Sequence, residues 1–253
     1  MIPLPRALVL ALGFYFGIPV VQISGTLQGQ TAPTDSILAI AHTLFTEAGL
    51  LANQGHQDEA ESKFQRVLDI REQALGLDHP DVALTLHNLG FIYNAQGRYA
   101  EAEPLLRRAL IIREAALGPQ HLEVALTLNS LAFTYGVRSR YEEAEPLYER
   151  ALAIDEIVLG PNHLEVAHVL SNLGMLYDDL DRYIEARSVY ERVLAIRETV
   201  LGLGHPDVAD ALINLASLYH HQELYAEAIP LYRRSLDIRE VEFGPEHSDT
   251  ALR

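Results

Sequence analysis

Apolar residues recur along most of this chain at the spacing of amphipathic helices. Between residues 79 and 95, Val82, Leu86, Leu89 and Tyr93 fall at i, i+4, i+7 and i+11, which places them on one face of a helix. A second apolar stripe follows Gly97 and consists of Ala102, Leu105, Leu106, Ala109, Leu110 and Ile112. The pattern predicts two helices joined by a short turn, which is a helical hairpin.

The residues at the expected helix ends support this interpretation. His79-Pro80-Asp81 is typical of a helix start, because proline is tolerated at the first helical position and an acid favours the positive end of the helix dipole. Gly97 ends the first helix, and the second begins near Tyr99, with Pro104 close to its first turn. Leu117-Gly118-Pro119 predicts a left-handed glycine cap followed by a proline that stops the helix.

The hairpin pattern repeats every 42 residues, and His79, His121, His163, His205 and His247 each open a copy. The first copy is less regular but keeps Gly55 in the place of Gly97. A period of this length predicts an all-α solenoid in which each hairpin packs on its neighbours. We expect about five hairpins in an array over 37–253, namely 37–78, 79–120, 121–162, 163–204 and 205–246, with a partial copy at 247–253.

The repeated residues resemble the tetratricopeptide repeat. Leu89-Gly90, Tyr93, Ala102 and Ala109 keep its relative spacing, and the 42-residue period resembles the kinesin light chain type. Leu-Gly-x-x-His-Pro-x-Val-Ala between copies and Tyr-x-Glu-Ala-Glu-Pro-Leu-Tyr within them carry that resemblance. It implies a right-handed superhelix whose concave groove, lined by first helices, binds peptides or partner proteins.

The resemblance also indicates which residues would line such a groove. One first-helix position holds Asn88, Ser130, Asn172 and Asn214, with Thr46 in the degraded first copy, and in related arrays an asparagine there hydrogen-bonds the peptide backbone. An amide can both donate and accept, so it can bind main chain of any sequence. The alternative is that these amides bond neighbouring backbone groups. Further predicted groove residues are His87, Phe91, Asn129, Phe133, Met175, Asp178 and Asp179.

The charge pattern narrows the class of partner. The net charge of −16 argues against nucleic acid, which requires clustered Lys and Arg. The predicted groove positions hold no Lys or Arg and become acidic toward the C-terminal end, at Asp178 and Asp179. The sequence therefore predicts a protein or peptide ligand that is partly basic, and makes an acidic tail a poor ligand.

We expect no enzymatic activity, no cofactor and no metal site. The chain contains no cysteine, and its glycines mark turns rather than a phosphate-binding loop. His220 and His221 lie near Asp178 and Asp179 in the predicted array, but adjacent histidines on a helix point about 100° apart, whereas a helical metal pair requires i, i+4 spacing. The repeated histidines at the helix starts are expected to cap or pack.

The N-terminus differs from the array. Residues 7–21 are uncharged and apolar, but as a helix they would span only about 22 Å, short of a bilayer core of about 30 Å. We interpret residues 1–32 as an export signal followed by a polar linker, with an uncleaved membrane anchor as the alternative. A periplasmic, secreted or membrane-anchored location is therefore expected ahead of a cytoplasmic one.

These observations lead to one main hypothesis and two alternatives. The main hypothesis is a non-catalytic scaffold that holds a peptide or partner protein in the groove. The first alternative is a sensor or regulatory region of a larger enzyme, such as a caspase-like peptidase. The second is a self-assembling rod, in which the apolar face of the last hairpin supports end-to-end association.

Overall fold

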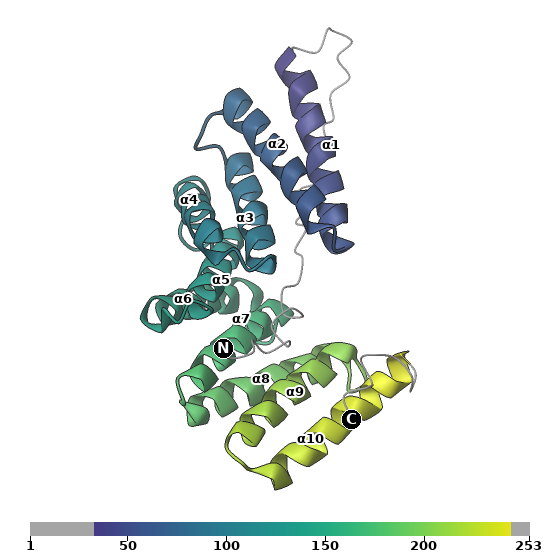
Figure 1. Ribbon diagram of the computed structural model, residues 1–253. Helices are drawn as coiled ribbons and strands as arrows, with labels where there is room; N and C mark the ends of the chain where they lie inside the picture. Colours follow the sequence, from purple (N-terminus) through teal and green to yellow (C-terminus); the bar gives the residue numbers. More distant parts are fainter. Residues whose placement is uncertain (1–32, 244–253) are drawn as a thin grey trace. The chain divides into compact units, whose positions relative to one another are not determined.

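The computed structural model describes residues 33–243, and within that range the chain forms ten α-helices and no strand (Figure 1). The predicted apolar segment 7–21 and the partial copy 247–253 lie outside the described residues. The predicted all-α array of about five helical hairpins is confirmed. The helices are α1 Pro33–Asn53, α2 Gln57–Leu75, α3 Pro80–Ala95, α4 Tyr99–Leu117, α5 Leu122–Gly136, α6 Tyr141–Leu159, α7 Leu164–Asp179, α8 Tyr183–Leu201, α9 Pro206–His221 and α10 Tyr225–Phe243.

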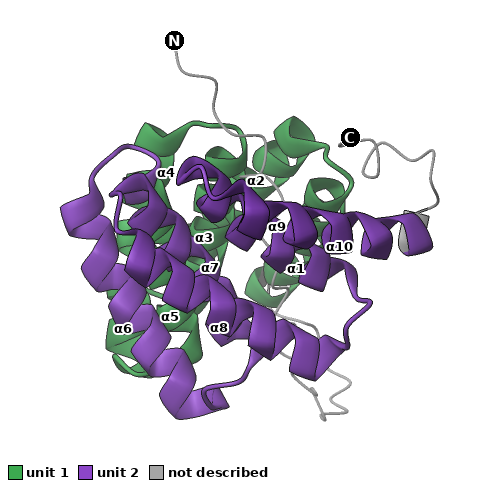
Figure 2. Ribbon diagram, turned by 90° about the horizontal axis from the view of Figure 1, so that it is seen from below, with its two compact units in different colours: residues 1–134 green, residues 135–253 purple. Residues whose placement is uncertain are grey.

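The chain divides into two compact units, residues 1–134 and residues 135–253, and the division falls inside α5 (Figure 2). In the first unit, α1 packs on α2, α2 on α3 and α3 on α4. In the second unit, the same order of neighbours runs from α6 to α10. Each unit therefore grows by packing each helix on the next one in the sequence, as expected for a repeat array.

The apolar stripes predicted from the sequence form the core of each unit. In the first unit, Leu86 and Leu89 of α3 are fully buried together with Phe64 of α2. In the second unit, Val166 and Leu170 of α7 pack with Val193 and Ile196 of α8. One helix face thus supplies both the contact within a hairpin and the contact to the next hairpin.

Glycine allows the closest approach between two helices of one hairpin. A Cβ atom added to Gly90 would lie 2.7 Å from Leu106 Cγ, and one added to Gly174 would lie 2.5 Å from Tyr190 Cε1. Both distances are shorter than any ordinary carbon contact, so Leu106 and Tyr190 occupy the space that a side chain would fill. The predicted Leu-Gly pair is therefore a packing feature of the hairpin.

The turns after the second helices differ from the prediction in one respect. Gly118 has φ 86° and ψ 157°, and Gly160 and Gly202 have nearly the same values. Positive φ explains why glycine is used, but a left-handed helical cap would have ψ near 47°. The expected left-handed cap is therefore wrong, and the chain instead leaves the helix in an extended, glycine-specific conformation.

Candidate peptide-binding faces

Histidine caps fix the start of the first helix in successive hairpins. The backbone N–H of Asp81 donates to His79 Nδ1 at 3.1 Å, and the N–H of Asp207 donates to His205 Nδ1 at 3.1 Å. His163 accepts in the same way from Glu165 N at 3.2 Å. Each ring satisfies one of the backbone donors that a helix start leaves unpaired. Capping was one of the two roles expected for these histidines.

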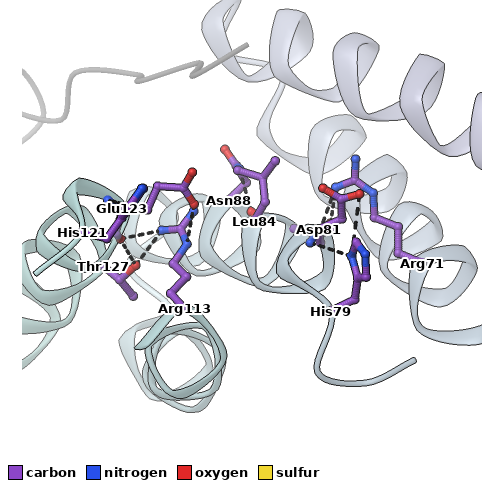
Figure 3. A network of polar contacts seen from close by, with 10 residues as sticks. Arg71, His79, Asp81, Leu84, Asn88, Arg113, His121, Glu123 and Thr127 are labelled. Atoms are coloured by element: carbon purple, nitrogen blue, oxygen red, sulfur yellow. Dashed lines mark hydrogen bonds and ion pairs between the residues drawn. The ribbon is translucent and has the colours of Figure 1, made fainter. Parts of the chain in front are cut away.

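Buried arginines then position the first helices α3, α5 and α9 against the preceding hairpins. Arg113 Nη1, on α4, donates to the backbone oxygen of Glu123 at 3.0 Å and to Thr127 Oγ1 at 2.6 Å, both on α5 (Figure 3). Arg71 makes the equivalent bonds to the backbone oxygen of Asp81 and to Thr85 Oγ1. Burial lowers the pKa of Arg113 to about 10, so the guanidinium stays charged at neutral pH.

The sequence reasoning did not assign this arginine position a role. Its signal was present, because Arg71, Arg113, Arg197 and Arg239 recur at the 42-residue period within an otherwise apolar stripe. A charged residue that recurs in such a stripe is expected to satisfy a buried acceptor. For the first three, the structure shows that the acceptors are backbone oxygens at the start of the next hairpin.

A second set of arginines stabilises the turn inside the three middle hairpins, at Arg98, Arg140 and Arg182. Arg98 stacks on Tyr93 with its guanidinium carbon 4.1 Å from the ring centre, and it pairs with Glu61 of the preceding hairpin at 2.6 Å. Arg182 repeats the arrangement on Tyr177 at 4.3 Å and pairs with Glu145 at 2.7 Å. These contacts stabilise the turns between the two helices of a hairpin, so these arginines do not line the exposed faces of the first helices.

The predicted groove residues of the first unit divide into buried and accessible groups. His87, Ser130 and Phe133 are 5–7% exposed and lie inside the unit. Asn88, Phe91 and Asn129 are partly exposed. The amide of Asn88 donates from Nδ2 to the backbone oxygen of Leu84 at 2.8 Å, one turn earlier in α3 (Figure 3). A ligand can reach the second group without displacing core side chains.

His87 has the character of a buried neutral imidazole. Its Nδ1 has no hydrogen-bond partner within the described chain. Burial, and then the neighbouring positive charge of Arg113, hold the pKa of His87 well below its usual value of 6.5. The first hairpin carries Phe45 at the same repeat position, stacked 4.7 Å from the guanidinium carbon of Arg71. His87 therefore lies near Arg113, as Phe45 lies on Arg71 in the first hairpin.

The second unit shows the same division. Asn172 is only 3% exposed, whereas Asn214 and Met175 are partly exposed and Asp179 is exposed. Asn214 and Asn88 occupy the same repeat position, three copies apart, and both present amide groups at the surface of a first helix. The accessible members of the predicted set therefore include an amide in each unit.

An acidic pair and a histidine lie together at the end of α7 and α9. His221 Nδ1 lies 2.9 Å from Asp178 Oδ2, whereas Asp178 Oδ1 is buried without a hydrogen-bond partner in the described chain. Burial raises the pKa of Asp178, and the charge of His221 partly offsets the shift. Burial, and then the charge of Asp178, also raise the pKa of Asp179. The local field favours a positively charged group at this position.

Neither a metal centre nor a membrane span is found within residues 33–243. No group of three or more His, Cys, Asp or Glu side chains in that range is arranged to hold a metal ion. None of the helices described there combines the length and the apolar composition needed to cross a membrane. The adjacent rings of His220 and His221 are centred 6.5 Å apart at an interplanar angle of 67°.

The helical hairpins, their 42-residue period and their glycine-mediated packing define a tetratricopeptide array, a fold that generally mediates protein–protein interaction. The family model described as tetratricopeptide repeat matches residues 39–110, 81–156, 123–199 and 207–252. The chain belongs to the tetratricopeptide repeat family. No curated protein matches the chain significantly.

Solved structures support the kinesin light chain type of repeat. BtubC (BKLC) from P. vanneervenii has 26% identity and a TM-score of 0.68, over 85% of this chain and 94% of its own. A Podospora anserina putative kinesin light chain with nearly identical TPR-like repeats has 24% identity and a TM-score of 0.67, over 81% and 98%. The apo form of RapI shares the fold at 17% identity and a TM-score of 0.67, over 80% and 71%. The resemblance inferred from the repeat motifs is thus confirmed.

Proposed function

We propose that this protein is a non-catalytic scaffold whose first-helix faces bind an extended peptide segment of a partner protein. The observation that carries the proposal is the recurrence of an accessible amide at one repeat position, Asn88 in the first unit and Asn214 in the second. Such amides can pair with peptide main chain, which has a donor and an acceptor in each residue. Asn172 shares the position but is buried, so the two accessible amides are the relevant ones.

The chemistry of the second unit supports a basic ligand. Asp178 and Asp179 lie at the end of α7, and the raised pKa of both carboxyls indicates that their charge is poorly compensated. A lysine or arginine of the ligand would supply the missing positive charge. We therefore propose that the bound segment carries at least one basic side chain near this end.

The first test is an affinity capture from the native host's extract with the full chain and with the double variant Asn88→Ala, Asn214→Ala. The matched control is Asn162→Ala, because Asn162 is an exposed asparagine in the loop before α7. The proposal predicts a partner that binds the parent and the control but is lost by the double variant. Equal capture by all three proteins would place the interface elsewhere and refute the proposal.

A charge-reversal test examines the proposal of a basic ligand separately from the proposal of a peptide-binding scaffold. Once a bound segment is identified, its basic residues are replaced by glutamate and its affinity is measured by titration calorimetry. We expect a loss of roughly tenfold or more for the parent, because the acidic end would then face like charge. The same loss should shrink in Asp179→Asn. Tighter binding of the acidic segment would contradict the basic-ligand proposal while leaving the scaffold function intact.

A second function, end-to-end self-association, is favoured by the last helix. Tyr148 and Tyr190 are 2–3% exposed, but Tyr232, at the same repeat position on α10, is 37% exposed. Ile229, three residues earlier on the same helix, is 50% exposed. We propose that a second copy covers this face. Sedimentation velocity should show concentration-dependent dimers for the parent and fewer for Ile229→Glu; a parent that is monomeric at all concentrations would rule this out.

For the N-terminus we propose an export signal or membrane anchor in residues 7–21, as the apolar, uncharged sequence suggests. A fusion of residues 1–36 to a reporter that is active only after export tests the proposal. We expect reporter activity with the native segment and none when Leu10 and Leu12 are both changed to Arg. Activity that is equally low in both fusions would contradict it.

A further inference from the structure

One hairpin joint lacks the arginine that the others use. The joint between α6 and α7 carries Asp155 at the repeat position that holds Arg71, Arg113 and Arg197. The three arginines each donate to the backbone oxygen ten residues later, at 2.9–3.0 Å. Asp155 reverses the charge at this position and removes the donor.

The replacement places an acid at a largely buried position. Asp155 is 6% exposed, so the acid lies at a largely buried position of the joint. Burial of an ionised carboxylate is unfavourable, since water solvates the charge far better than the interior of a protein. Deprotonated Asp155 therefore weakens the joint that an arginine would have strengthened.

The groups around Asp155 increase this cost. Glu165 on α7, at the position where the other joints present their backbone acceptor, adds negative charge, and His168 on α7 partly offsets it. His168 Nδ1 lies 3.6 Å from Glu165 Oε2. On α6 itself, Glu156 is paired with Arg192 of α8 at 2.6 Å. Burial, and then the charge of Glu165, raise the pKa of Asp155 from 3.8 to about 7.

We propose that the joint between α6 and α7 is a proton-controlled joint, which closes firmly when Asp155 is protonated and opens more readily when it is ionised. A protonated carboxyl is neutral, so its burial in the closed joint avoids the cost of desolvating a charge. The proposal concerns the array itself and does not depend on the peptide-binding function. It predicts a pH response within the physiological range in one joint of the second unit.

The direction of the response follows from the titration of Asp155. The closed joint holds the proton with a pKa of about 7, and an opened, solvated joint holds it at 3.8. Closure is therefore favoured most below about pH 4, and this contribution is lost as the pH rises through about 7. Between about pH 5.5 and about pH 8, the equilibrium constant for opening should rise roughly thirtyfold.

Hydrogen exchange of the full chain, analysed by mass spectrometry and corrected for intrinsic rates, tests the proposal. Fragments from α6 and α7 should lose protection by roughly thirtyfold between about pH 5.5 and about pH 8. Fragments from α8 and α9, whose joint holds Arg197, serve as the internal control and should change by less than about threefold. A change of equal size in both joints would overturn the proposal.

Two variants identify the responsible group. Asp155→Asn resembles the protonated acid in shape and donor capacity, so it should keep the joint protected at both pH values. Glu165→Gln removes the neighbouring charge and should move the midpoint of the transition to lower pH without abolishing it. If the pH response persists unchanged in Asp155→Asn, another group is responsible and the proposal fails.

Discussion

The two units form the same hairpins, but they differ in the residues that occupy the positive-φ position of the hairpin turn. The turn after each first helix requires positive φ, and the first unit supplies Gly55 and Gly97 there, at φ 83° and 74°. The second unit supplies Ser139, Asp181 and Glu223 at φ 57–61°. That conformation costs a residue with a Cβ atom about 1 kcal/mol or more. The packing of the repeat therefore determines the turn conformation. In the second unit, Ser139, Asp181 and Glu223 adopt positive φ although residues with a Cβ atom disfavour it.

The joints show the same contrast in their electrostatics. In the first unit, Arg71 and Arg113 satisfy backbone oxygens of the following hairpin. In the second unit, Arg197 does so at one joint, whereas Asp155 occupies the other. The fold thus tolerates a reversed charge at a buried position, because many apolar contacts at each joint support the same packing. The second unit is where we expect a hairpin joint to open and close with pH in the physiological range.

The largest effect is expected from removing the arginine of the first unit. Arg113→Met keeps much of the volume but removes the buried guanidinium donor; Thr127 Oγ1 then loses its donor, and the backbone oxygen of Glu123 keeps the bond from the Thr127 hydroxyl. We expect a loss of about 3 kcal/mol in unfolding free energy, measured by urea denaturation. Arg107→Met, which removes a 50% exposed arginine paired with Glu103, should cost less than about 1 kcal/mol. Equal losses would show that burial of Arg113 is unimportant.

A smaller, pH-dependent effect should distinguish the first unit from the second. Because the pKa of His87 is held well below 6.5, the folded state takes up a proton less readily than the unfolded chain. The stability of the first unit should therefore fall as the pH drops below 6.5, by up to about 1.4 kcal/mol for each pH unit. This is opposite in sign to the response of Asp155.

The variant His87→Phe copies the first hairpin, which has Phe45 at this position, and should remove that loss. Urea denaturation at about pH 5 and about pH 7.5 measures the difference. His42→Phe, at an exposed position of α1, is the control and should leave the pH dependence unchanged. A parent whose first unit gains stability in acid would contradict the assignment of His87 as a buried neutral imidazole.

The smallest effect should come from relieving a turn of the second unit. Glu223 is exposed and has φ 61°, so Glu223→Gly removes the steric cost without removing a buried contact. Glycine also increases the conformational freedom of the unfolded chain, which leaves a net gain of about 0.5 kcal/mol. The reverse change, Gly97→Ala, should cost about 1 kcal/mol in the first unit. Thermal unfolding measures the stability change in both variants. Stabilisation by Gly97→Ala would contradict the assignment of a steric cost to positive φ at this turn.

The helical hairpins could be predicted because each depends on local sequence. Apolar spacing gives the buried face, and His79-Pro80-Asp81 gives the helix start and its cap. The glycine after α4 was predicted as a helix end, but its ψ value was not, because ψ depends on how the chain enters the next hairpin. Local signals therefore determine where helices begin and end, and tertiary contacts determine the geometry of the connection.

The accessibility of the candidate binding residues could not be predicted from their repeat position. Asn88 and Asn214 are partly exposed, whereas Asn172 is 3% exposed at the same position. Their surroundings differ in side chains from neighbouring helices, which a single repeat does not specify. The role of Asp155 could not be predicted for the same reason. Its charge is exceptional only in comparison with the buried arginines at the same repeat position of the other joints. The burial of a residue depends on the side chains of the neighbouring copies as well as on its own repeat.

The pairing of turn arginines with the preceding hairpin has a consequence for how such a chain changes length. Arg98 and Arg182 each reach a glutamate 37 residues earlier, so a deletion or duplication of 42 residues preserves every such pair. Excision of residues 114–155 would place Arg113 ten residues before Glu165 and restore an arginine to the joint with α7. Recombination between copies can therefore shorten the array and remove its proton-controlled joint in the same event.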